Sequence, residues 1–153
     1  MEIYDADKAA KVWQRVRGVS TDTAAAATGG HGLQNLILQS LNQIDLYQQL
    51  TRRFTGQEHR LLQTMIRQEY AICAGLKGIG TLLRGAPPIA NIPATTFETT
   101  DAGLRKCYRL AMQSAAEYDT RSTDPEYGNA FSHMLQIKRT HCFYILQLLG
   151  KQK

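Results

Sequence analysis

The chain has 153 residues, of which 43% are hydrophobic and 20% are charged, and this is enough for one domain with its own core. The formal net charge is +5, but lysine and arginine are scattered and are not interleaved with aromatic residues, so nucleic-acid or other anion binding is the least favoured function. No run of about 18 apolar residues is present, and we therefore expect no membrane span.

The first residues are acidic and polar, without the basic and apolar regions of a signal peptide, so we expect a cytoplasmic protein. Residues 5–17 are predicted to form a short leader helix, because Asp5 can cap the first turn and an apolar stripe repeats at helical spacing. The members of this stripe are Ala9, Val12, Trp13 and Val16. Residues 20–32 contain four consecutive alanines followed by two glycines, and we interpret them as a linker. Leader helix and linker together occupy residues 1–32.

Apolar residues at helical spacing predict a bundle of four long helices in residues 33–150, and no segment alternates like a strand. The chain is therefore expected to be all-α and to fold as a single domain. The predicted helices cover residues 33–54, 57–84, 100–121 and 124–149. Three cysteines fall inside these helical patterns without the spacing of a metal knuckle, so we expect reduced, buried thiols. They are Cys73, Cys107 and Cys142.

The lengths of the connections predict the topology. The first two helices are joined by a few residues, as are the last two, so each pair should be an antiparallel hairpin. The middle connection of about 14 residues can span roughly 46 Å, whereas a helix of about 28 residues is roughly 42 Å long. This connection can therefore travel the length of the bundle and make the third helix parallel to the second. A floppy loop is the alternative.

Charged side chains interrupt the predicted inward faces of three helices. Glu69 lies on the second helix, Glu117 on the third, and Lys138 and His141 on the fourth. Buried glutamates without a counter-ion would be costly, or would take up protons with raised pKa values. An inward lysine avoids this cost, and Lys138 can pair with Glu69, with Glu117 or with both.

Four helices with a long central connection resemble the ferritin-like superfamily, in its rubrerythrin-type bacterial branch. Residues 4–17 look like the short leader helix found in some members. The segments 117–119 and 122–128 are similar to the junction between the last two helices of that branch. The resemblance covers nearly the whole chain. It implies a one-crossover bundle that holds two iron ions between its helices.

The resemblance also implies a metal motif with Glu on the first and third helices and Glu-x-x-His on the second and fourth. Residues three apart share a helical face, so Glu and His can reach one metal together. This chain keeps three of the six ligands, Glu69, Glu117 and His141. The other three positions hold Ser40, Ile72 and Lys138. Because an ammonium beside a metal ion is unfavourable, we interpret Lys138 as a replacement for the metal charge.

Two functional hypotheses follow. The first is a ferritin-like bundle that has lost its di-iron site, has no cofactor or catalytic residue, and serves a structural or protein-interaction role. The alternative is a divergent rubrerythrin-like metalloprotein, with iron-handling or oxidoreductase activity, that holds one ion through the three remaining ligands. A homodimer is expected in either case, because oligomers are common in the superfamily and the leader helix adds an apolar stripe.

Overall fold

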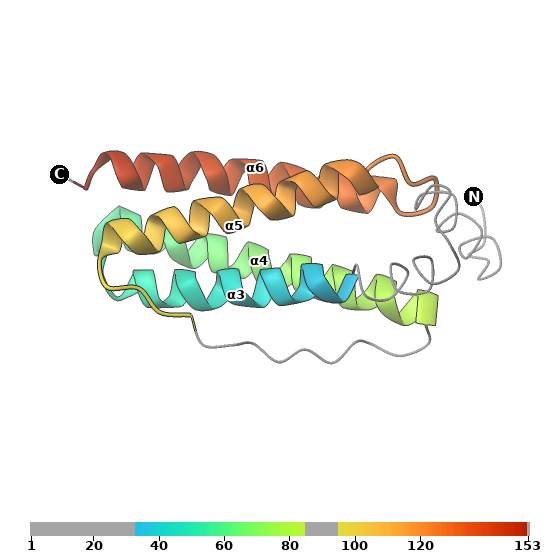
Figure 1. The fold of residues 1–153 in the computed structure, drawn as a ribbon, viewed down its shortest axis with the longest axis horizontal. Helices are drawn as coiled ribbons and strands as arrows, with labels where there is room; N and C mark the ends of the chain where they lie inside the picture. The colour runs from blue at the N-terminus through green and yellow to red at the C-terminus, as the bar shows by residue number, and fades with distance from the viewer. Residues whose placement is uncertain (1–32, 85–94, 153) are drawn as a thin grey trace.

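The computed structural model describes residues 33–84 and 95–152, and within these ranges the chain forms four α-helices and no strand (Figure 1). The helices are α3 (Leu33–Thr51), α4 (Gly56–Arg84), α5 (Thr100–Arg121) and α6 (Gly128–Gly150). The predicted all-α four-helix bundle is confirmed. The predicted leader helix and linker, residues 1–32, lie outside the described residues. None of the four described helices combines the length and apolarity that crossing a bilayer requires.

The helices form two antiparallel hairpins, α3–α4 and α5–α6, which pack side by side (Figure 1). Helix α3 lies against α5 and α4 lies against α6, so α4 and α5 occupy opposite corners of the bundle. Both of these helices run in the same direction, from left to right in Figure 1. Arg84 and Thr100 therefore lie at opposite ends of the bundle, and the chain between them must travel its length. The predicted one-crossover topology is confirmed.

The interior contains two apolar clusters, one toward each end of the bundle. The first takes residues from the start of α3 and α6 and from the end of α4 and α5, including Leu33, Leu76, Tyr118 and Phe131. The second takes residues from the opposite halves of the same helices, including Leu50, Leu62, Leu104 and Ile145. Six buried polar residues occupy positions between the two clusters: Ser40, Gln43, Glu69, Ser114, Lys138 and His141. We refer to these six residues as the polar layer.

The turn between α3 and α4 differs slightly from the prediction, because α3 ends at Thr51 rather than at residue 54. The amides of Arg52 and Arg53 bond to carbonyls three residues earlier, and Nδ1 of His59 lies 2.8 Å from the Thr51 carbonyl oxygen. These contacts satisfy carbonyls at the helix end and close the last turn. Gly56 then adopts a φ of 64°, which glycine tolerates without steric cost and which lets α4 begin at once.

Helix α6 begins at Gly128, four residues later than predicted. The carboxylate of Asp124 does accept backbone N–H bonds, from Glu126 at 3.0 Å and from Tyr127, but these bonds close a separate turn before the helix. Gly128 lies so close to Ser122 that an added Cβ would be 2.5 Å from the Ser122 carbonyl oxygen. This close approach fixes how the α5–α6 hairpin folds back on itself.

Candidate functional site

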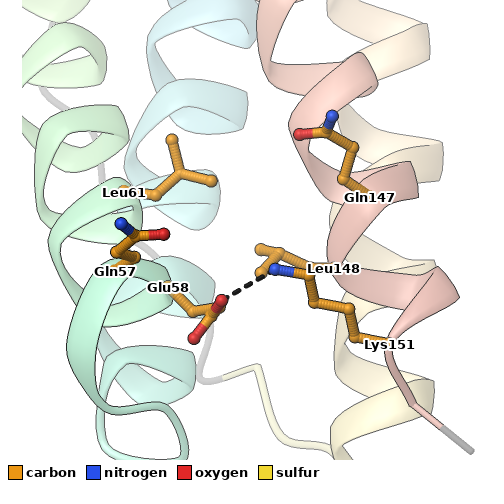
Figure 2. A pocket seen from close by; sticks show the side chains of 6 residues that line it. All are labelled: Gln57, Glu58, Leu61, Gln147, Leu148 and Lys151. Carbon is orange, nitrogen blue, oxygen red and sulfur yellow. Dashed lines mark hydrogen bonds and ion pairs between the residues drawn. The ribbon is translucent and has the colours of Figure 1, made fainter.

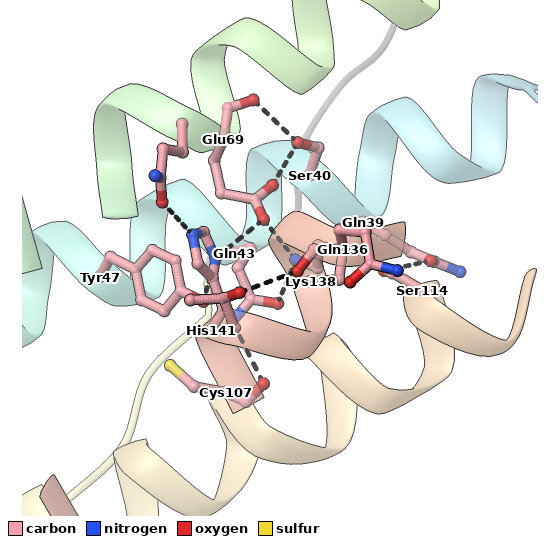
Figure 3. A network of polar contacts seen from close by, with 12 residues as sticks. Gln39, Ser40, Gln43, Tyr47, Glu69, Cys107, Ser114, Gln136, Lys138 and His141 are labelled. Carbon is pink, nitrogen blue, oxygen red and sulfur yellow. Dashed lines mark hydrogen bonds and ion pairs between the residues drawn. The ribbon is translucent and has the colours of Figure 1, made fainter. Parts of the chain in front are cut away.

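The polar layer is centred on an ion pair between α4 and α6 (Figure 3). Nζ of Lys138 donates to Oε1 of Glu69, and the two side chains are 1% and 0% exposed. The other carboxylate oxygen, Oε2, accepts a bond of 2.6 Å from the hydroxyl of Ser40 on α3. Both oxygens of the buried carboxylate therefore have a donor, and its negative charge is balanced by an ammonium inside the bundle.

Gln43 on α3 ties the ion pair to α5. Its Nε2 donates to the carbonyl oxygen of Cys107 at 3.1 Å, and its Oε1 lies 3.4 Å from Nζ of Lys138. The amide orientation follows from these two partners, because the carbonyl needs a donor and the ammonium needs an acceptor. Beside this contact, Ser114 on α5 donates to Oε1 of Gln39 on α3 at 2.7 Å. All four helices thus contribute to one connected layer.

The imidazole of His141 is the third titratable group of the layer. Its Nε2 lies 2.8 Å from Oε1 of Gln68, and its Nδ1 lies 3.2 Å from the hydroxyl of Tyr47 and 3.5 Å from Oε1 of Glu69 (Figure 3). Because Nε2 faces an acceptor, we assign the proton to Nε2 and let Nδ1 accept from the tyrosine hydroxyl. Burial, together with repulsion from Lys138, lowers the pKa of His141 below its usual value, and the imidazole is neutral at pH 7.

The charges around Glu69 determine its protonation state. Burial on its own would raise the pKa of this carboxyl, but attraction to the ammonium of Lys138 and the hydrogen bond from it outweigh burial and lower the pKa to about 2. Burial and the nearby carboxylate raise the pKa of Tyr47 well above its usual value, so its hydroxyl keeps its proton and acts as a donor. The layer therefore holds one carboxylate, one ammonium and one neutral imidazole at neutral pH.

The structure brings together three of the four predicted site residues, Glu69, Lys138 and His141, and places Glu117 apart from them. The Glu117 side chain is 44% exposed, and its Oε2 accepts a bond of 2.8 Å from Nε of Arg121 one turn later. The prediction that Glu117 faces the core is therefore wrong. Helix α5 turns Ser114 and Tyr118 inward, which leaves Glu117 at the border of the inward face, beside a hollow between α3 and α5.

Two side chains of the polar layer have the spacing of metal ligands. Oε1 of Glu69 and Nδ1 of His141 are 3.5 Å apart, close to the separation of two ligands that bind one ion through bonds of about 2.1 Å. The ammonium of Lys138, however, donates to that same Oε1. No three His, Cys, Asp or Glu side chains gather around a common point in the described parts of the chain. The predicted ligand set is thus reduced to a pair.

Two glutamines of the network were not identified from the sequence. Gln43 lies three residues after Ser40, so helical spacing places it on the same inward face, and this signal could have identified it. Gln68 precedes Glu69 and reaches His141 from the edge of α4, and no spacing rule indicates that contact. Ile72, at the position where the resemblance implies a histidine, is 2% exposed and belongs to an apolar cluster.

A separate hollow of about 250 Å³ lies between the start of α4 and the end of α6 (Figure 2). Nζ of Lys151 lies 2.8 Å from Oε2 of Glu58 across it, and the two side chains are 61% and 29% exposed. Ion pairs at the surface contribute little stability and perturb their environment weakly. The polar layer, rather than this hollow, is therefore the candidate functional site.

Comparisons with protein-family models, with curated proteins and with solved structures gave no match. The membership in the ferritin-like superfamily, which the resemblance implies, therefore stays a prediction.

Proposed function

We propose that this chain is a ferritin-like helical bundle that has lost its di-iron chemistry and serves a structural or protein-interaction role. The observation that carries the proposal is the buried ion pair between Glu69 and Lys138. An ammonium and a metal ion stabilise a buried carboxylate in the same way. Each supplies a positive charge that offsets the cost of burying the ionised carboxylate.

The identity of the replaced ligands supports this proposal. Carboxylates are expected at the positions of Ser40 and Lys138, and both residues instead donate hydrogen bonds to Glu69. A carboxylate that binds a metal needs no donor on its metal-facing oxygen, whereas one without a metal needs a donor on each oxygen. Two acceptor positions have thus become donor positions, and both donors are directed at the one remaining carboxylate of the layer.

The alternative is that Glu69 and His141 hold one metal ion, in a divergent rubrerythrin-like metalloprotein with iron-handling or redox activity. Its support is the spacing of 3.5 Å between the two side chains. Against it stands the ammonium of Lys138 on the same oxygen, since a cation beside a cation site is strongly unfavourable at low dielectric.

Metal analysis of the full chain, purified without chelator, tests the proposal. We expect far less than one transition-metal ion per chain, both as purified and after incubation with ferrous iron followed by desalting. Two irons per chain would overturn the proposal. One ion per chain that is lost in Glu69→Gln and in His141→Gln would establish the alternative.

The expected homodimer is part of the same proposal, and its support is the resemblance, because oligomers are common in the ferritin-like superfamily. Light scattering of the full chain over a range of concentrations tests this expectation. A mass of one chain at every concentration would contradict it.

A further inference from the structure

An apolar groove of about 260 Å³ runs along the outer side of the α5–α6 hairpin. Ala115, Leu135 and Cys142 form its floor, and all three are largely buried. Met112 lines it from α5 and is 47% exposed, although methionine is among the residues most often found inside proteins. The floor and this wall give the groove an apolar surface that the described part of the chain does not cover.

Two more large apolar side chains extend this surface along α6. Phe143 is 57% exposed and Leu146 is 49% exposed. Phe143 lies four residues after Arg139 and Leu146 four residues after Cys142, so each is the neighbour on the helix surface of a residue that lines the groove. Three of the five exposed large hydrophobic residues in the described ranges therefore gather on this hairpin. Contiguous exposed apolar surface of this kind marks a docking site.

Opposite charges border the groove. Asp119 lies on its α5 side and Arg139 on its α6 side. Neither side chain forms an ion pair with another residue in the described ranges. A segment with an apolar stripe and basic residues along one edge can cover the floor of the groove and pair with Asp119.

We propose that the N-terminal segment of the same chain, residues 5–17, docks as an amphipathic helix in this groove. Its predicted apolar stripe contains Val12 and Trp13, which would lie over the floor of the groove. Lys8 and Arg15 lie seven residues apart along one edge of this stripe, and they can reach Asp119 at the rim of the groove.

The place where the segment joins the bundle favours it over other occupants. Leu33, the first residue of α3, belongs to the same apolar cluster as Ala115 and Leu135, so the chain enters the bundle in the half that holds this part of the groove floor. About 20 residues separate Trp13 from Leu33 and can span roughly 66 Å, while each helix that must be passed is only about 10–12 Å wide. The tether holds the segment near the groove at an effective concentration in the millimolar range. A second copy of the chain has no such advantage.

Trp13 is the only tryptophan of the chain, so its fluorescence reports directly on the proposed docking. In the full chain we expect blue-shifted emission and several-fold protection from acrylamide quenching. Met112→Asp places a charge in the groove at an exposed position and should shift the emission to longer wavelength and remove the protection. Far-UV circular dichroism should show that the four-helix bundle is retained in this variant.

Leu82→Asp is the matched control, because Leu82 is 51% exposed on α4 and does not line the groove. It should leave the emission of Trp13 unchanged. Equal quenching of Trp13 in the parent chain and in Met112→Asp would overturn the proposal, as would an equal red shift in Leu82→Asp. Protection that disappears on dilution, together with dissociation of a dimer in light scattering, would assign the groove to a second copy and would also overturn it.

Discussion

Glu69 on α4 and Lys138 on α6 form an ion pair in which neither side chain is more than 1% exposed. Desolvation of two charges costs several kcal/mol per ion, and the pair recovers this cost only with good geometry and further hydrogen bonds. Ser40 and Gln43 supply those bonds. The two charges therefore depend on each other.

Lys138→Met should destabilise the bundle by about 3–5 kcal/mol at neutral pH, because it leaves the Glu69 carboxylate buried without a counter-charge. Urea unfolding gives this free energy directly. Lys77→Met, at an exposed lysine of α4, is the control and should change little. The double variant Glu69→Gln/Lys138→Met should recover much of the loss, since it removes both charges. Equal losses in the two lysine variants would contradict a buried pair.

Acid should lower the free energy of unfolding of the bundle, because it protonates the Glu69 carboxylate. Its pKa of about 2 in the folded chain lies below the ordinary value of 4.5, so the folded state binds its proton later than the unfolded state. The contribution, on the order of 3 kcal/mol, is complete above pH 4.5 and is lost as pH falls toward 2. Glu69→Gln should lack this loss when the free energy of unfolding is measured over that range. Parallel pH profiles for the parent chain and the variant would show that Glu69 is not the group responsible.

His141 should change the stability of the bundle at a higher pH than Glu69 does. Its pKa in the folded chain lies below the ordinary 6.5, so the unfolded chain takes up the proton first as pH falls. Stability should decline below pH 6.5, with a slope of up to about 1.4 kcal/mol per pH unit for one proton. Between pH 6.5 and 4.5, His141→Gln should flatten this part of the profile, while His133→Gln, at an exposed histidine, should not. If both histidine variants retain the slope, the assignment to His141 fails.

Lys138→Glu should create a metal site. Two carboxylates and one imidazole would then face one another, with Glu69 and His141 already 3.5 Å apart. The variant should be destabilised in chelator and stabilised by Zn²⁺, by about 2.7 kcal/mol at a concentration 100-fold above the dissociation constant. Thermal unfolding with and without the metal measures this shift. Adding His141→Gln should reduce the response strongly. An unchanged response would locate the metal elsewhere on the chain.

Glu117→Gln should have a much smaller effect than substitutions in the polar layer. Arg121, its partner on the same helix, is 3% exposed, but the Glu117 side chain is 44% exposed, and a pair with one solvated partner contributes less than a pair in which both charges are buried. The free energy of unfolding should therefore fall by far less than in Lys138→Met. A loss as large as in Lys138→Met would mean that Glu117 also contributes to the buried charge balance.

Helical spacing in the sequence was sufficient to predict the four helices and the inward positions of Glu69, Lys138 and His141. It failed at Glu117 because periodicity defines an inward face only to within about 100° of arc. Glu117 falls at the border of that face, and the neighbouring Tyr118 occupies the centre instead. Helix packing, rather than spacing, decided which of the two residues was buried.

The pairing within the polar layer depended on the rotation of neighbouring helices. The sequence left the partner of Lys138 open between Glu69 and Glu117, and only the packing of α6 against α4 selects Glu69. The start of α6 was also misplaced, since the capping contacts of Asp124 do close a turn, but the helix resumes at Gly128. Capping signals locate a chain reversal more reliably than they locate the first helical residue.

The two hairpins on either side of the crossover carry buried charges of opposite sign. The α3–α4 hairpin carries the anion, on Glu69, and the α5–α6 hairpin carries the cation, on Lys138. If the backbone were cleaved between Arg84 and Thr100, each fragment would hold an ion that only the other can neutralise. The two fragments should therefore reassociate with each other in preference to self-pairing, because two like hairpins would bring together charges of the same sign.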